Sequence, residues 1–230
     1  MHSDSPEIYR PVRSFVRRAG RVTIAQREAL DTLLPSYALD LTGPFDAEGV
    51  FGRVAPCWLE IGFGNGGVLL DLAARFPDVD FVGAEVHDPG VGRLLIGLHE
   101  QRLTNVRVHH GDVTDLFSGC IPNDTLARIL LFFPDPWPKK RHHKRRFVQP
   151  VRARQLAQLL CEGGVLHAAT DWQPYAEDML AVFEAEPLLT NTSASGNFAP
   201  DADVRPETHF ERRGRRLGHD VWDLIFRRGP

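Results

Sequence analysis

The strongest constraint on the fold is an alternation, from residue 57 onward, of short apolar segments with segments whose apolar residues recur at helical spacing. The strand-like segments cover residues 57–62, 80–86, 105–112, 127–135, 163–171 and 221–227. Helices are expected over residues 68–76, 92–103, 147–161 and 175–186, with a shorter one near 23–33. Strands that are regularly separated by helices require a parallel sheet covered on both faces, so the predicted class is α/β.

The chain of 230 residues is long enough for one domain with a large mixed core. We expect a basic, partly flexible N-terminal arm over residues 1–50 and the α/β domain over residues 51–230. Neither a signal peptide nor a membrane-spanning run is expected. The three cysteines form no Cys-x-x-Cys pair, which favours a protein of the reducing cytoplasm without a disulfide framework, a zinc site or another metal.

Basic residues are clustered, although the formal net charge of the chain is -3. The run 139–146 reads Lys-Lys-Arg-His-His-Lys-Arg-Arg and holds every lysine of the chain, and arginines crowd residues 10–27 and 205–216. A polyanion responds to a local patch, so a slightly acidic protein can still bind RNA. For any one cluster, a set of solvated surface charges is the default interpretation, but the three clusters together favour a nucleic-acid partner.

A glycine-rich turn, Glu60-Ile-Gly-Phe-Gly-Asn-Gly-Gly, follows the first strand-like segment. Gly62 and Gly64 allow a sharp turn and a close approach of the backbone to a ligand, because neither has a Cβ. With Gly67 they also satisfy Gly-x-Gly-x-x-Gly, and Glu85 stands at a suitable distance to accept a ribose hydroxyl. By itself this motif leaves a nicotinamide-dependent dehydrogenase open as a rival.

Carboxylates stand at the ends of successive strand-like segments: Glu60, Glu85, Asp112 and Asp135. The carboxyl ends of parallel strands meet at one edge of a sheet, so we expect these side chains in one cluster. Glu60 suits a sulfonium or ammonium group better than a pyrophosphate. Asp112 could accept a hydrogen bond from an adenine amine, and the proline-bracketed Asp135 has no use in hydride transfer. Ordinary strand-end carboxylates are the alternative, which a row of this kind makes less favourable.

Several motifs, in this order and at compatible spacing, resemble those of tRNA (guanine-N7)-methyltransferases over residues 55–226. They are Glu60-Ile-Gly-Phe-Gly, Gly83-Ala-Glu-Val-His, Phe132-Phe-Pro-Asp-Pro-Trp, Lys144-Arg-Arg, Ala169-Thr-Asp-Trp and Arg213-Gly-Arg-Arg-Leu-Gly-His. The resemblance implies a class I, Rossmann-like methyltransferase fold: a doubly wound, mostly parallel seven-stranded sheet with its last strand antiparallel. It also implies S-adenosylmethionine as methyl donor and the guanosine at position 46, in the variable loop of tRNA, as acceptor.

The same resemblance assigns roles to individual residues. On the cofactor side it places Glu60, Gly62, Gly64, Glu85, Asp112 and Asp135, of which Asp135 matches the catalytic position. On the substrate side it places Lys139, Asp171, Thr208, His209, Phe210 and Glu211. His209 stands where many relatives have Lys or Arg, so a phosphate contact there would depend on pH. Pro138 stiffens the approach to Lys139, and residues 1–50 are not informed by the resemblance.

Methylation of guanine N7 requires no general base, because N7 carries an in-plane lone pair and no proton. The base becomes cationic during the transfer, so nearby carboxylates stabilise the transition state electrostatically. They can also hold the N1–H and 2-amino edge and thereby orient N7 towards the methyl carbon. We expect Asp135, Asp171 and Glu211 to share these roles.

The basic residues after Asp135 are expected to hold RNA phosphates and deliver the target base: Lys139, Lys140, Arg141, Lys144, Arg145 and Arg146. A solvated loop or a nuclear localisation signal is the alternative. Trp137 and Trp172 could stack on a base or cofactor, or equally pack the loops.

Other functions remain open at this stage. One is an RNA-binding module on a decayed methyltransferase fold, and another is methylation of a different RNA or of DNA. tRNA is the expected partner, and both a monomer and a homodimer agree with the sequence.

Overall fold

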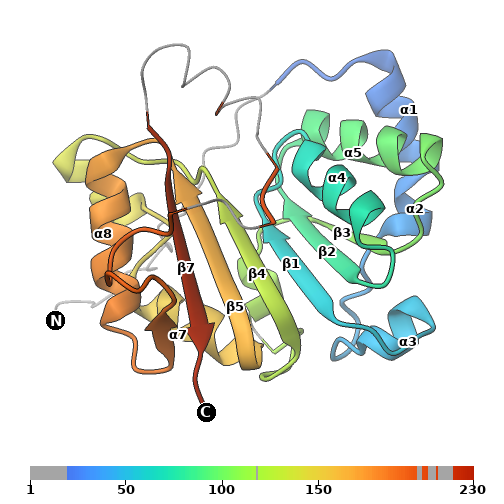
Figure 1. Ribbon diagram of the computed structural model, residues 1–230. Coiled ribbons are helices and arrows are strands. Elements are labelled where there is room, and N and C mark those ends of the chain that lie inside the picture. The colour runs from blue at the N-terminus through green and yellow to red at the C-terminus, as the bar shows by residue number, and fades with distance from the viewer. Residues whose placement is uncertain (1–19, 118, 201–203, 207–210, 212–219) are drawn as a thin grey trace, which may run out of the picture.

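The computed structural model describes residues 20–117, 119–200, 204–206, 211 and 220–230. In this part of the chain the centre is a seven-stranded sheet with the order β3-β2-β1-β4-β5-β7-β6 (Figure 1). The strands are β1 Cys57–Ile61, β2 Asp80–Glu85, β3 Val106–His110, β4 Leu126–Phe132, β5 Leu160–Thr170, β6 Leu189–Asn191 and β7 Trp222–Arg228. β1 to β5 run parallel, whereas β7 is antiparallel to its neighbours β5 and β6. The predicted doubly wound sheet, with the last strand antiparallel, is confirmed.

Helices cover both faces of the sheet (Figure 1). One face packs against α4 Gly67–Arg75 and α5 Asp88–Glu100, with α1 Ile24–Thr32 packed on α5, and the other against α7 Pro150–Leu159 and α8 Gln173–Glu184. Shorter elements are α2 Leu34–Tyr37, α3 Ala47–Phe51, α6 Thr114–Phe117 and the 3-10 helix η1 Lys140–Arg145. Because helices lie on both sides, all five residues of β1 are buried, which explains why all of them except Glu60 are apolar.

Local signals account for where the longer helices begin. The helix expected near 23–33 is found as α1, and the Thr23 side chain accepts from the backbone N–H of Gln26 while the Gln26 side chain caps Thr23 in return. α7 begins with Pro150, and α5 and α8 carry proline within their first two positions, where the missing N–H costs nothing. The short elements α2, α3, α6 and β6 were not expected one by one, because so few residues carry no periodic signal.

The segment before β1 packs against the α/β domain. Ala29 is buried in the core on the α4–α5 face, whereas Leu39 and Phe45 are buried in the core on the α7–α8 face. The division at residue 50 remains a prediction, and the arginines at positions 10–18 lie outside the described residues. Among the helices that the structure describes, none combines the length and apolar character needed to span a membrane.

Candidate active site

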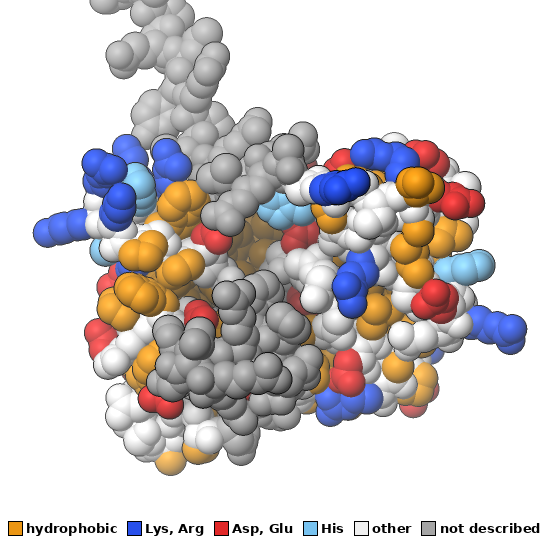
Figure 2. Space-filling view, turned by 90° about the horizontal axis from the view of Figure 1, so that it is seen from above, with side chains coloured by type: hydrophobic (Ala, Val, Ile, Leu, Met, Phe, Trp, Pro, Cys, Tyr) orange, Lys and Arg blue, Asp and Glu red, His pale blue; other side chains and the backbone are white. Residues whose placement is uncertain are grey.

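A pocket opens at the carboxyl ends of the parallel strands, where β1 lies between β2 and β4. Successive strands add on one side of β1 and then on the other, and ligands of doubly wound sheets bind in the crevice that this reversal creates. The lining residues come mainly from the ends of β1, β2 and β4 and from the turn after β3. Figure 2 looks onto this edge and shows a hollow bordered by acidic and hydrophobic side chains.

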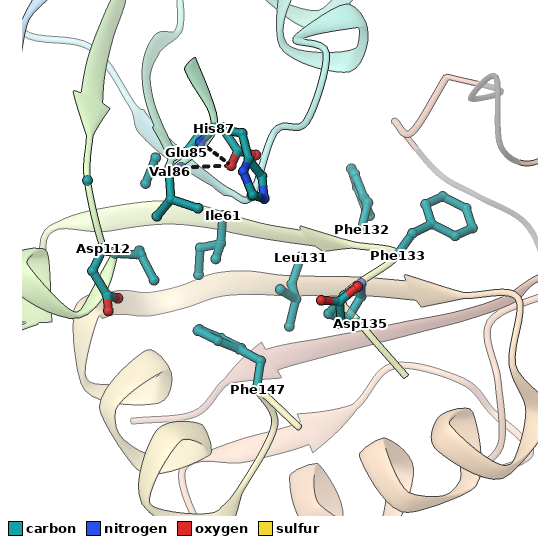
Figure 3. A pocket seen from close by; sticks show the side chains of 15 residues that line it. Ile61, Glu85, Val86, His87, Asp112, Leu131, Phe132, Phe133, Asp135 and Phe147 are labelled. Carbon is teal, nitrogen blue, oxygen red and sulfur yellow. Dashed lines mark hydrogen bonds between the residues drawn. The ribbon is translucent and has the colours of Figure 1, made fainter. Parts of the chain in front are cut away.

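Three of the predicted strand-end carboxylates line this pocket: Glu85, Asp112 and Asp135. In Figure 3, Asp112 and Asp135 lie on opposite sides of a group of apolar side chains that includes Ile61 and Leu131. Asp135 is exposed, and no group within the described residues donates a hydrogen bond to its carboxylate. The pocket thus has an apolar middle and acidic ends, one of which is free to bind a ligand.

Glu85 is held rigidly by backbone groups (Figure 3). Its carboxylate accepts hydrogen bonds from the N–H of Gly64 at 2.9 Å, of Val86 at 2.7 Å and of His87 at 3.0 Å. A carboxylate offers about four acceptor positions, so a position remains for a ligand hydroxyl.

Glu60 lies one residue before the end of β1 and does not line the pocket. It shares a face of the strand with Trp58, opposite to Ile61, because side chains alternate along a strand. Glu60 is 3% exposed, and its Oε2 has no hydrogen-bond partner among the described residues. Burial, and secondarily the charge of Glu85, raise the pKa of Glu60 to about 8. An unsatisfied buried acceptor of this kind is stabilised by a cation.

The glycine-rich turn leaves open space beside its backbone. Gly62 has a φ of 68° and Gly64 a φ of 56°, and a Cβ built on either residue would meet no atom within 4 Å. Gly90, in the first turn of α5, was missed by the sequence reasoning, although a glycine within a predicted helix is a signal of close packing. A Cβ there would lie 2.0 Å from the carbonyl oxygen of Gly64, so the helix touches the turn through its backbone.

Asp171 directly follows β5 and comes close in register to Asp135. Phe132 pairs with Ala169 across β4 and β5, and the N–H of Phe133 donates to the Ala169 carbonyl at 2.7 Å. The segments that carry Asp135 and Asp171 therefore continue from neighbouring strands at one edge. Trp172, next to Asp171, remains 38% exposed.

The predicted RNA-binding run forms η1 and its flanks beside the pocket. Lys139, Lys140, Arg141 and Lys144 are exposed and Arg145 is half-buried, and Figure 2 shows a group of Lys and Arg side chains on this side of the hollow. Trp137 packs within the run, with the Arg145 guanidinium 5.1 Å and the His142 ring 5.9 Å from its ring. Partial desolvation, and then the charges of Arg141, Arg145 and Lys139, lower the pKa of His142, which favours the neutral imidazole.

Arg146 differs from the rest of the run, because it is 4% exposed and faces inward. It donates to the Pro136 carbonyl and to Asp178 of α8. The structure therefore does not place Arg146 on the basic surface with the other predicted RNA-binding residues.

Glu211, which was expected on the substrate side, lies in a buried ion-pair cluster near the C-terminus. Arg205 donates to Glu211 and, at 2.8 and 2.7 Å, to both carboxylate oxygens of Asp223, which also contacts His167 at 2.8 Å. Burial opposes the ionisation of Asp223, but the hydrogen bonds from His167 and Arg205 outweigh it and lower its pKa. The Arg205 guanidinium also lies 5.9 Å from the Phe132 ring, just before the Asp135 loop. Thr208, His209 and Phe210 lie outside the described residues.

Comparisons with known proteins agree with this architecture. The model of a family described as "Putative methyltransferase" matches residues 54–224. The crystal structure of the 16S rRNA methyltransferase KamB covers 82% of this chain and 96% of its own, with a TM-score of 0.60 and 16% identity, a likeness that shows the fold alone. The fold, the pocket and the family match together define a class I methyltransferase.

Curated relatives narrow the class. A tRNA (guanine-N(7)-)-methyltransferase of Methylococcus capsulatus is 53% identical over 99% of this chain and 97% of its own length. One of Pseudomonas aeruginosa is 53% identical over 98% of this chain and 93% of its own length. The chain belongs to the tRNA (guanine-N(7)-)-methyltransferase family.

Proposed function

We propose that this protein transfers a methyl group from S-adenosylmethionine to N7 of the guanosine at position 46 in the variable loop of tRNA. The observation that carries this proposal is the position of Asp135. It is an exposed carboxylate at one side of the pocket, and the chain continues from it directly into the exposed basic run. A purine that must become cationic would thus meet a negative charge on a surface that attracts its own phosphates. The family supports the same activity.

The residues present fit S-adenosylmethionine. The unsatisfied Glu60 Oε2 suits its ammonium or sulfonium, and the open space at Gly62 and Gly64 suits a ligand laid against the backbone. The remaining acceptor position of Glu85 would take a ribose hydroxyl, and Asp112 the adenine amine. When bound, the donor supplies an electrophilic methyl group.

The reaction that these residues serve is an in-line displacement. The lone pair of guanine N7 forms the new bond to the methyl carbon, and the electrons of the breaking bond remain on sulfur. No proton has to leave N7, so Asp135 and Asp171 act by holding the purine edge and by stabilising the developing positive charge. The apolar middle of the pocket strengthens that electrostatic effect by excluding water.

The exposed basic run supplies the affinity for tRNA in this proposal. Lys139, Lys140, Arg141, Lys144 and Arg145 would contact phosphates, which position the RNA without reading its sequence. We place the reaction in the cytoplasm, in agreement with the free thiols of the chain.

The proposal is tested by incubating the protein with bulk tRNA and S-adenosylmethionine and mapping 7-methylguanosine by cleavage at the modified site. Asp135→Asn serves as the matched variant. We expect turnover to fall by about 100-fold, because the negative charge that stabilises the cationic guanine is lost. Affinity for S-adenosylmethionine should change little. Methylation at another position, binding of NAD in place of the donor, or wild-type turnover of Asp135→Asn would each contradict the proposal.

A further inference from the structure

The segment that carries Asp135 has a backbone that does not hold itself in place. Pro134, Pro136 and Pro138 have no N–H to donate. Phe133 and Trp137, which flank this segment, have positive φ angles of 52° and 43°. Such conformations of non-glycine residues persist only where the surrounding structure imposes them. Other groups must therefore fix the position of Asp135.

The start of the segment is bonded to the sheet, and its end accepts a hydrogen bond from a side chain that the structure describes, that of Arg146. The N–H of Phe133 donates to the Ala169 carbonyl at 2.7 Å. At the other end, Nε of Arg146 donates to the Pro136 carbonyl at 2.8 Å. Asp135 lies between these anchors. Removal of the Arg146 hydrogen bond would weaken the hold on this loop at its second end.

The Arg146 guanidinium is itself held by α8. Its Nη1 donates to Asp178, and the group lies 4.8 Å from the centre of the Tyr175 ring. Tyr175 is fully buried, and its hydroxyl accepts a hydrogen bond from the N–H of Val148 at 3.2 Å. One guanidinium thus joins the loop after β4 to a helix that begins just after β5. Only its planar fork of donors allows both bonds at once.

We propose that Arg146 is a positioning residue for methyl transfer, which holds Asp135 in place through the Pro136 carbonyl and does not bind tRNA phosphate. Only 3% of its side chain is exposed, so an RNA phosphate cannot reach it without displacing these partners. The inference rests on the proposed function, since it assigns Arg146 a part in that reaction.

Arg146→Lys separates positioning from phosphate binding. Lysine keeps the positive charge but cannot bond Pro136 and Asp178 through one planar group. We expect kcat to fall by about 10- to 100-fold, because small displacements of a reacting group are costly. The dissociation constant of S-adenosylmethionine and the salt dependence of tRNA affinity should stay within about twofold of wild type. The matched control is Arg154→Lys. Arg154 lies on α7 and forms an ion pair with Glu186, which follows α8, so this change should leave kcat unchanged.

Asp178→Asn tests the same inference if the Arg146→Lys protein does not fold. The Asp178 side chain is 54% exposed, so the change is tolerated, and it weakens only one of the two bonds of Arg146. A smaller fall in kcat, about 3- to 10-fold, is expected. Wild-type kcat in both variants would overturn the inference, and so would a loss confined to tRNA affinity with a flatter salt dependence. If the wild-type protein itself forms no 7-methylguanosine, the proposed function fails instead.

Discussion

The two sides of the pocket are built from different kinds of groups. On the side of β1 and β2, the site is formed mainly by backbone atoms. Three N–H groups bind the Glu85 carboxylate, and Gly62 and Gly64 leave open space for a ligand beside the turn. On the side of β4, β5 and β7, buried guanidinium groups hold the loops, through Arg146 at Pro136 and Arg205 at Asp223. The first side should therefore be sensitive to added atoms, and the second to the loss of a single charged side chain.

The largest expected change in the free energy of unfolding is on the side of β4, β5 and β7, where charged side chains hold the structure. Arg205→Met removes the buried guanidinium that pairs with both Asp223 and Glu211, which should lower the free energy of unfolding by about 3–5 kcal/mol. Urea denaturation measures this change. The control is Arg75→Met, because the Arg75–Asp71 pair is 46% and 42% exposed and should contribute less than about 1 kcal/mol. Equal losses in both variants would remove the distinction between the two sides.

On the side of β1 and β2, where mainly backbone groups form the site, the stability also depends on one buried side chain, the carboxyl of Glu60. Its pKa in the folded protein, about 8, lies above the ordinary value of 4.5, so the folded state retains a proton that the unfolded state loses. Stability from this group is full below pH 4.5 and is lost as the pH rises through 8, by about 5 kcal/mol for a shift of this size. Glu60→Gln should lack this dependence in urea titrations from pH 5 to 9. Parallel curves for both proteins would contradict the prediction.

The same ionisation predicts how the donor binds. A cation bound at Glu60 favours the carboxylate, so affinity for S-adenosylmethionine should rise from pH 6 to 8 and level off above, with release of a proton. Titration calorimetry in buffers of different ionisation enthalpy measures the number of protons released when the donor binds. Glu60→Gln is again the control and should release none from this position.

A smaller loss is expected from an added methyl group at the turn. Gly90→Ala places a Cβ 2.0 Å from the Gly64 carbonyl oxygen, so the two backbones must separate, at a cost of about 1–3 kcal/mol. The turn would move with them, and affinity for the donor should fall. Gly43→Ala, where a Cβ meets nothing within 4 Å, should behave as wild type. Donor affinity equal to wild type in Gly90→Ala would show that the turn is not held through this contact.

The smallest effect concerns the exposed basic run. Replacing Lys140 and Lys144 by alanine removes two solvated charges and should leave folding and donor affinity unchanged. The slope of the logarithm of tRNA affinity against the logarithm of salt concentration should flatten by about one to two units. An unchanged slope would show that these residues do not contact RNA and would leave Arg146 to be reconsidered as a contact.

Much of the fold could be predicted from local sequence, because strands and helices differ in the spacing of their apolar residues. Four of the five residues of β1 are apolar, and the start of α1 carries the capping residues Thr23 and Gln26. The grouping of Glu85, Asp112 and Asp135 followed from the rule that parallel strands end at one edge. β6 was not predicted, because a strand of three residues is too short to show a periodic pattern.

The sequence by itself determined which residue types stand at the ends of the strands and where the charges cluster. Only the tertiary structure decided which of them face a ligand. Arg145 and Arg146 are identical neighbours, yet Arg146 is buried because α8, far along the chain, offers Asp178 and Tyr175. Likewise, Glu60 is 3% exposed and Glu211 is bound by Arg205, although both carboxylates stand among local sequence signals for a ligand site. Burial and ion pairing depend on segments that only folding brings together, so local pattern cannot specify them.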